Sequence, residues 1–179
     1  MVRRGVYLAC AVVATAIAVG LQAAPAAPAG FGSRLTLTSY ELGVVTQLNE
    51  IRVEHGLPPL KLNAALTSAA SRHCEEMAAD GYFGHDSADG VSLLSRIRQY
   101  YGSTGYGYWS VGENLLWSNA SLVAARAAGI WMASAEHRAN LLSPLWRDIG
   151  IAAVSTPDAP GVYDHLAVTV IATDFGVRK

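Results

Sequence analysis

Three ionisable side chains lie where a folded chain could use them for chemistry: His85, Glu113 and His137. Histidine and glutamate are common proton donors and acceptors in protein sites. His85 precedes a polar loop, and His137 follows the polar last turn of an expected helix. Glu113 lies in an otherwise apolar segment, where a carboxylate must be paired, hydrogen-bonded or open to a cleft. No local spacing joins the three residues, so only the fold can bring them together.

The other histidines give weaker signals. His55 ends an expected helix, where a cation interacts favourably with the helix dipole. His73 lies on the apolar stripe of a second helix and is interpreted as a satisfied core residue, and the sequence gives His165 no role. Ser134 precedes His137 by three residues, which can bring the two side chains together on a helix. That pair forms no catalytic triad without an acid and an oxyanion hole.

Capping signals mark the first two helices. Thr38 and Glu41 have the spacing of a capping box, and the apolar residues that follow recur at helical spacing up to Gly56. Asn63 can cap a second helix that ends before Gly81. These signals place two helices in the first half of the domain.

The later part of the chain changes from helices to strands. A third helix is expected over residues 93–100, and Ser121 is expected to cap a fourth that runs through Trp131 towards Ser134. Strands are expected around residues 111–117, 148–154 and 165–174, with a turn-like break at 156–161 that contains two prolines. The pattern predicts an α+β domain in which helices cover both faces of a small sheet.

The N-terminal region has the order of a secretory signal peptide. Arg3 and Arg4 are followed by an almost entirely apolar run from Leu8 to Leu21 and then by small residues. We expect a signal peptide over residues 1–29 with cleavage near 23–29, a short leader over 30–37, and one domain over 38–179. An uncleaved segment that anchors the chain in a membrane is the alternative. Either interpretation places the domain outside the cell or in the cell envelope.

The net charge and the cysteine content limit the classes of partner and the covalent links that the chain can form. Without Arg3 and Arg4 the chain has 11 basic and 14 acidic residues, a net charge of −3. Nucleic-acid binding requires a basic face that neutralises phosphates. A chain with this net charge shows no sign of one, so we expect no nucleic-acid partner. Cys74 is the single cysteine of the expected domain, which excludes an internal disulfide there. We interpret it as a buried small hydrophobic residue.

Four segments, taken together and in order, resemble the bacterial branch of the CAP superfamily, the cysteine-rich secretory, antigen 5 and pathogenesis-related proteins with SCP-like domains. The resemblance covers roughly residues 40–176. It implies a three-layer α-β-α sandwich with a small, mainly antiparallel sheet. The segments are Asn49–Arg52 with Gly56 and Leu60, then Tyr82–His85, Val111–Leu115, and Trp131–Ser134 with His137–Leu142 and Asp148–Ile151.

The resemblance also implies a site. In CAP domains the matching histidines and glutamate line a central cavity, so His85, Glu113 and His137 are expected to meet there. The family often binds a divalent ion such as zinc through the two histidines, here His85 and His137. Glu113 would then be a ligand, a partner that orients a histidine, or a general base on a bound water. The competing interpretation is a buried hydrogen-bond network that only holds the sheet to the helices.

One position departs from the family pattern. Animal and plant members carry a second acid three residues after the tryptophan that matches Trp131, whereas this chain has Ser134. Ser134 therefore takes that place in the expected cavity, unless Glu136 or Asp86 substitutes for the missing acid. The departure weakens the case for tight metal binding and for hydrolysis.

Three functions remain open at this stage. The first is a secreted binding or interaction module for a lipid, a sterol or another apolar ligand, or for a component of the cell envelope. The second is a metal-dependent, protease-like hydrolase that works through His85, His137 and Glu113, with Glu113 as the candidate catalytic residue. The third is an envelope-interaction protein whose polar network is structural. A glycine-rich loop with several aromatic residues, from Tyr100 to Trp109, could form the rim of a ligand groove or pack on the domain. We favour binding over catalysis.

Overall fold

The computed structural model describes residues 5–9, 13–16 and 36–179. Two short strands lie in the N-terminal part, β1 (Val6–Ala9) and β2 (Val13–Ala16), and both pair with an edge of the main sheet. The expected signal-cleavage region lies outside the described residues. Within the described ranges, no helix combines the length and the apolar character needed to cross a membrane.

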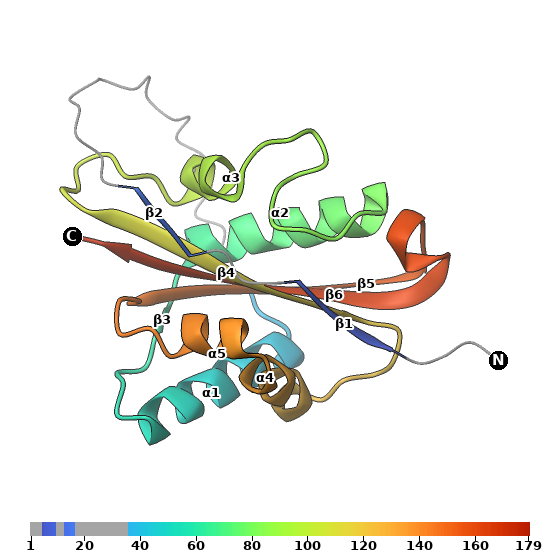
Figure 1. Cartoon of the computed structure of the whole chain (residues 1–179), viewed down its shortest axis with the longest axis horizontal. Helices are drawn as coiled ribbons and strands as arrows, with labels where there is room; N and C mark the ends of the chain where they lie inside the picture. The colour runs from blue at the N-terminus through green and yellow to red at the C-terminus, as the bar shows by residue number, and fades with distance from the viewer. Residues whose placement is uncertain (1–4, 10–12, 17–35) are drawn as a thin grey trace.

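The domain has three layers (Figure 1). Helices α2 (Ala64–Asp80) and α3 (Leu93–Tyr100) cover one face of the sheet. Helices α1 (Ser39–Glu54), α4 (Ala124–Ala133) and α5 (Ala135–Leu141) cover the opposite face. Buried apolar side chains fill both spaces between helices and sheet. The arrangement confirms the predicted α+β sandwich.

The sheet is mainly antiparallel. Its strand order is β1-β4-β6-β5-β3, and β2 also pairs with β4. Strands β4 (Trp109–Ser118), β6 (Leu166–Arg178) and β5 (Asp148–Ala159) form the antiparallel centre. The two-residue strand β3 (Lys61–Leu62) adds a parallel edge beside β5. The long strand β4 carries Glu113 at its middle, which fixes the candidate site at the centre of the sandwich.

The capping predictions for the first two helices are confirmed. The Thr38 hydroxyl accepts a hydrogen bond from the Glu41 main-chain N–H at 3.2 Å, and the Glu41 carboxylate accepts one from the Thr38 N–H at 2.8 Å. The Asn63 side chain accepts from the first main-chain N–H groups of α2, which ends at Gly81 in the left-handed conformation. These local contacts satisfy donors and acceptors that every helix end leaves open.

Two local expectations are wrong. Ser121 does not cap the fourth helix, because α4 begins three residues later, after Val123, and has no side-chain cap. The expected break at residues 156–161 is part of strand β5, which continues to Ala159 and is followed by a short 3-10 turn over Gly161–Tyr163. The pairing of β5 with β6 is irregular between Thr156 and Ala159. A proline, which lacks an N–H, is tolerated at such an irregularity.

The two faces of β4 are chemically different. Successive side chains of a strand point to opposite faces of its sheet. Gly112 and Asn114 face α5: a Cβ at Gly112 would lie 2.8 Å from Trp146 and 2.9 Å from Asn140, and the Asn114 amide contacts Asn140. Glu113 therefore points to the other face, towards α2 and α3.

Candidate functional site

Glu113 is the centre of a buried polar group on the α2 and α3 side of the sheet. Its side chain is fully buried, and each carboxylate oxygen has a partner. The ring Nδ1 of His85 lies 2.8 Å from Oε1, and Arg96 donates from Nη2 to Oε2 at 2.8 Å. Because an ionised carboxylate only accepts hydrogen bonds, Nδ1 of His85 must carry the proton in this pair.

The surroundings of Glu113 keep it ionised. Burial by itself would raise its pKa, but the positive charge of Arg96 and the hydrogen bond from His85 outweigh that effect. Together they hold the pKa of Glu113 at about 2. The carboxylate is therefore negatively charged throughout the physiological range and already bonded on both oxygens.

Arg96 reaches Glu113 from helix α3. Burial would lower the pKa of this guanidinium, yet the negative charge of Glu113 beside it raises it overall. Nη2 also donates to the main-chain oxygen of His85 at 3.2 Å, so Arg96 fixes the loop as well as the carboxylate. Its Nε and Nη1 are buried and have no hydrogen-bond partner among the described residues.

Asp174 lies directly opposite Glu113, on β6. It is fully buried, and burial together with the negative charge of Glu113 raises its pKa well above the ordinary range. Neither Asp174 oxygen has a hydrogen-bond partner among the described residues. We therefore treat Asp174 as protonated and Glu113 as ionised, which avoids two adjacent buried negative charges.

His73 completes the group from helix α2. Its Nε2 lies 2.9 Å from the Gly84 main-chain oxygen and must donate to it, while Nδ1 faces the Tyr82 hydroxyl at 3.4 Å. Burial lowers the pKa of His73, so the ring is neutral near pH 7 despite lying 3.9 Å from Glu113. The interpretation of His73 as a satisfied core residue is confirmed.

His137 and Ser134 lie elsewhere. The ring Nδ1 of His137 is 2.7 Å from the Ser134 hydroxyl, and the main-chain oxygen of His137 accepts a hydrogen bond from Asn114. Asn114 points away from Glu113, because the two residues are neighbours on one strand. The structure thus brings His85 and Glu113 together, and places His137 and Ser134 in the α5 layer on the opposite face of the sheet. The single shared cavity expected from the sequence is divided by β4.

The donor set does not fit a multi-ligand metal centre. In the part of the chain that the structure describes, no three His, Cys, Asp or Glu side chains are placed to hold one ion. Asp86 is exposed and accepts a hydrogen bond from the Leu93 main-chain N–H, and Glu136 is exposed on α5, so neither replaces the missing acid. A divalent ion bound through His85 and His137 stays a prediction.

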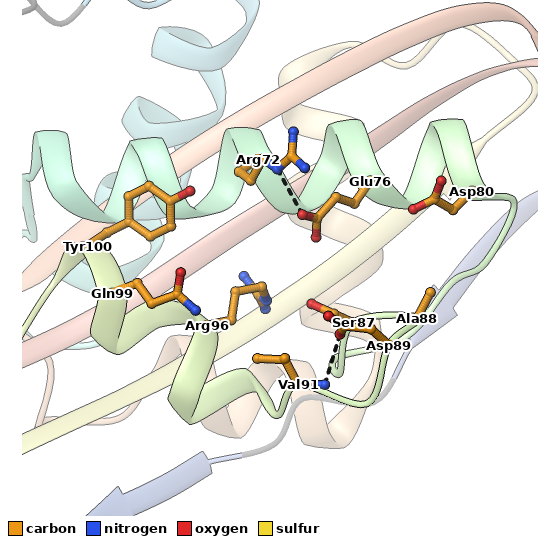
Figure 2. Close-up of a pocket in the computed structure, with 10 residues that line it drawn as sticks. All are labelled: Arg72, Glu76, Asp80, Ser87, Ala88, Asp89, Val91, Arg96, Gln99 and Tyr100. Carbon is orange, nitrogen blue, oxygen red and sulfur yellow. Dashed lines mark hydrogen bonds and ion pairs between the residues drawn. The ribbon is translucent and has the colours of Figure 1, made fainter.

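A pocket of about 480 Å³ opens beside the Glu113 group, between α2, α3 and the loop that joins them (Figure 2). Arg96 lies between the two walls, so one residue both binds Glu113 and lines the pocket. The lining is polar, and it comprises Arg72, Glu76, Asp80, Ser87, Ala88, Asp89, Val91, Arg96, Gln99 and Tyr100.

The sequence interpretation missed Arg96 and Asp174. Asp174 had a usable signal, because it is a carboxylate within an apolar strand, as Glu113 is. Arg96 had none, since arginine is an ordinary residue on a surface helix and only the docking of α3 buries it. In the aromatic loop, Tyr101 and Trp109 are fully buried, and the Trp109 indole donates to the Tyr101 main-chain oxygen, so these rings form core.

The chain is similar in sequence to two bacterial proteins. The chain is 28% identical over 121 residues to the uncharacterized protein YkwD of Bacillus subtilis, which covers 68% of this chain and 45% of that protein. It is 29% identical over 114 residues to the uncharacterized membrane protein YlbC of the same organism, covering 64% of this chain and 31% of the relative. The chain thus spans less than half the length of these relatives.

Solved structures give the same result. An outer surface protein from Borrelia burgdorferi has the same fold, with a TM-score of 0.59 at 20% identity over 76% of this chain and 90% of that one. An extracellular protein containing a SCP domain from Bacillus anthracis is similar with a TM-score of 0.54 at 28% identity, over 82% of this chain and 45% of that one. The model of the cysteine-rich secretory protein family, CAP, matches residues 45–171. The chain therefore belongs to the CAP family.

Proposed function

We propose that this chain is an extracellular binding protein, not an enzyme, and that it holds its ligand in the pocket between α2 and α3. The observation that carries the proposal is the state of Glu113, which is buried, ionised and bonded on both oxygens. Beside it, Arg96 of α3 binds this carboxylate and also lines an open, polar pocket.

The state of Glu113 argues against the hydrolase alternative. A general base needs a pKa near the working pH and must reach the proton that it removes. Glu113 has a pKa of about 2, and Arg96 and His85 occupy its oxygens. His137, the expected second histidine of a catalytic centre, lies in α5 on the other face of the sheet. Binding requires none of these groups to change partner.

We infer the extracellular location from the expected signal peptide and from the likeness to an extracellular protein with a SCP domain. The similar protein from Bacillus anthracis is described as extracellular. The polar lining of the pocket favours a polar ligand over the lipid or sterol expected as one alternative.

A fragment screen by ¹H–¹⁵N NMR tests the binding function. We expect some small polar fragments to shift amides of α2, α3 and the loop between them in a saturable way, with no turnover of any fragment. The matched control is Glu136→Gln, an exposed change on the opposite layer, which should leave the shifts unaltered. A folded protein in which no fragment shifts these amides, or a hydrolytic activity that Glu113→Gln abolishes, would contradict the proposal.

A metal-binding role is the second candidate, and one observation favours it. Nε2 of His85 is buried without a hydrogen-bond partner among the described residues, while Nδ1 is fixed by Glu113. Histidines that bind metals commonly donate their other nitrogen to a carboxylate in this way. Calorimetric titration with zinc, after chelator treatment, tests it on the wild type, on His85→Ala and on His137→Ala. Loss of binding in both variants would support the predicted pair, loss in His85→Ala alone would leave His85 as the ligand, and no binding by the folded wild type would end the metal hypothesis.

A further inference from the structure

We propose that the outer edge of strand β4 is a second binding site, which adds an extended, uncharged segment of a partner polypeptide to the sheet as an antiparallel strand. The preferred segment carries an aromatic side chain opposite Trp117. The site is separate from the pocket between α2 and α3, so this inference goes beyond the proposed function and does not depend on it.

Strand β4 is the last strand of the domain on its side of the sheet. Strand β6 pairs with one edge of β4 over all ten residues, Trp109–Ser118. Among the described residues, the other edge pairs only with β1 and β2, which come from the N-terminal segment (Figure 1). Because these two strands lie within the expected signal peptide, removal of residues 1–29 would leave main-chain donors and acceptors of β4 open.

The edge of β4 is built in a way that permits pairing. Proteins commonly protect an exposed edge with lysine or proline residues, with a bulge, or by keeping the edge strand very short. Strand β4 is ten residues long, contains no lysine or proline, and pairs with β6 in a single register. Once uncovered, such an edge is a template for an incoming strand.

The charge of the surrounding sequence favours an uncharged segment. Glu113 is the only charged residue between Arg98 and Arg126, a stretch that contains β4 and the loops on both sides of it. Its carboxylate points towards α2 and α3, where Arg96 and His85 bind it. A charged side chain on an incoming strand would therefore lose part of its hydration without gaining a counter-charge from this stretch.

The N-terminal strand shows which contacts the edge offers. Strand β1 (Val6–Ala9) pairs with residues 115–118 of β4 in the antiparallel direction. The ring of Tyr7 stacks on Trp117, with centroids 4.0 Å apart and planes 7° apart. Stacked aromatic pairs are more favourable than the buried area alone accounts for. Main-chain pairing and one aromatic contact thus describe a segment that fits.

Polar groups at the end of β4 fix the register of the added strand. The Gly5 N–H donates to the Asn119 side-chain oxygen at 2.6 Å, and the Ser118 hydroxyl donates to the Gly5 main-chain oxygen at 3.3 Å. The main-chain N–H of Asn119 donates to the same oxygen at 3.3 Å. A strand that slipped by one residue would lose these contacts and would turn its aromatic side chain to the other face of the sheet.

A short segment of another polypeptide suits the edge better than a second copy of the domain. The strand that the structure places there is single and carries no helices of its own. A second β4 would bring helical layers on both of its faces to the same edge. The N-terminal segment leaves Tyr7 46% and Leu8 42% exposed, so it covers the edge incompletely.

The test uses the full chain with Tyr7→Pro and Leu8→Pro, which unpair β1 because proline lacks the N–H that a strand donates. Two adjacent residues are changed because only alternate residues of a strand donate to a given neighbour. The probe is the peptide acetyl-Gly-Val-Tyr-Leu-Ala-amide, which repeats residues 5–9, titrated into the ¹⁵N-labelled protein. We expect saturable shifts of the amides at residues 115–119, and at least tenfold weaker binding by the wild type, where β1 occupies the edge.

Three changes isolate the contacts. N-methylation of the tyrosine and leucine nitrogens of the peptide removes main-chain donors and should weaken binding at least tenfold. Alanine in place of the peptide tyrosine should weaken it about three- to tenfold, and lysine at that place still more. On the protein, Asn119→Ala in the proline variant should weaken the unmodified peptide about two- to tenfold, because it removes the acceptor for the first N–H of the strand.

Each contrary result has a distinct meaning. Equal binding of the N-methylated peptide overturns strand addition, and no binding by the folded proline variant overturns the site. A dimer of the proline variant, detected by light scattering and dissociated by the peptide, would make a second copy the occupant. Failure of this site appears at residues 115–119, whereas failure of the proposed function appears at the amides of α2 and α3, so the two outcomes are distinguishable.

A second form of the protein covers the case in which the proline variant does not fold, as judged by circular dichroism. The wild-type chain is folded with a protease site introduced within residues 24–29, cut, and titrated with the same peptides. A cut chain that keeps its N-terminal fragment against excess peptide would show that this fragment is the occupant. Unfolding of both forms would show that β1 is a permanent strand of the domain, and would overturn the proposal.

Discussion

Glu113 and Asp174 face each other across β4 and β6, and both carboxyl groups are fully buried. Arg96 and His85 hold the negative charge on Glu113, while burial and the charge of Glu113 raise the pKa of Asp174 well above its ordinary value. The pair is stable as one charge and one proton. The stability of the folded protein should therefore depend on pH through this pair.

The free energy of unfolding should fall as the pH rises from the ordinary pKa of Asp174 towards its raised pKa in the folded protein. A carboxyl with a raised pKa in the folded state takes up a proton on folding, so its contribution is fully present below the ordinary value of 3.8 and is lost as pH rises towards the folded-state pKa. Asp174→Asn removes this proton uptake and should flatten the slope by up to about 1.4 kcal/mol per pH unit. Urea unfolding of both proteins from pH 4 to 8 measures the slopes, and identical slopes would show that Asp174 is ionised in the folded protein.

Glu113→Gln should destabilise the domain by about 3–5 kcal/mol, because it leaves the buried guanidinium of Arg96 without its counter-charge. The wild-type contribution of Glu113 is present above its ordinary pKa of 4.5 and is lost as pH falls towards about 2. Chemical unfolding at pH 7 checks the cost, with exposed Glu136→Gln as the control, which should change stability by less than about 0.5 kcal/mol. A cost for Glu113→Gln no larger than the control would mean that Arg96 does not need this partner.

Gly112 should not tolerate a side chain. Its Cβ would lie 2.8 Å from the Trp146 ring and 2.9 Å from the Asn140 side chain, and both of these are buried. Gly112→Ala should therefore cost about 1–3 kcal/mol through overpacking. Gly129→Ala on α4 is the matched control, since nothing lies within 4 Å of its added Cβ, and it should stabilise by about 0.5–1 kcal/mol. Thermal unfolding of the two variants should give shifts of opposite sign, and shifts of the same sign would count against the close contact of β4 with α5.

Cys74 should be chemically inert in the folded protein. The thiol is fully buried against the sheet, and burial raises its pKa well above the ordinary value, so little thiolate forms near pH 7. A chromogenic disulfide reagent should react with Cys74 only after denaturant unfolds the domain. Rapid reaction of the native protein would instead show that α2 opens readily from the sheet.

Much of the architecture follows from local sequence signals. Thr38 with Glu41 and Asn63 mark helix starts because a cap acts within a few residues, and the third helix covers residues 93–100 as predicted. Such signals failed where tertiary contacts compete with them. Strand β5 continues through the segment expected to be a turn because β6 pairs with it on either side of the irregularity.

The sequence by itself determined the family, the layered fold and the need of Glu113 for a partner, since a carboxylate within an apolar strand cannot remain unpaired. Only the tertiary structure decided which partner that is. Arg96 becomes buried when α3 docks, and Asp174 meets Glu113 through the register of β4 with β6. The alternation of side chains along β4 then directs Glu113 to one face of the sheet and Asn114, with His137, to the other. Docking and register are long-range properties, and spacing along the chain does not encode them locally.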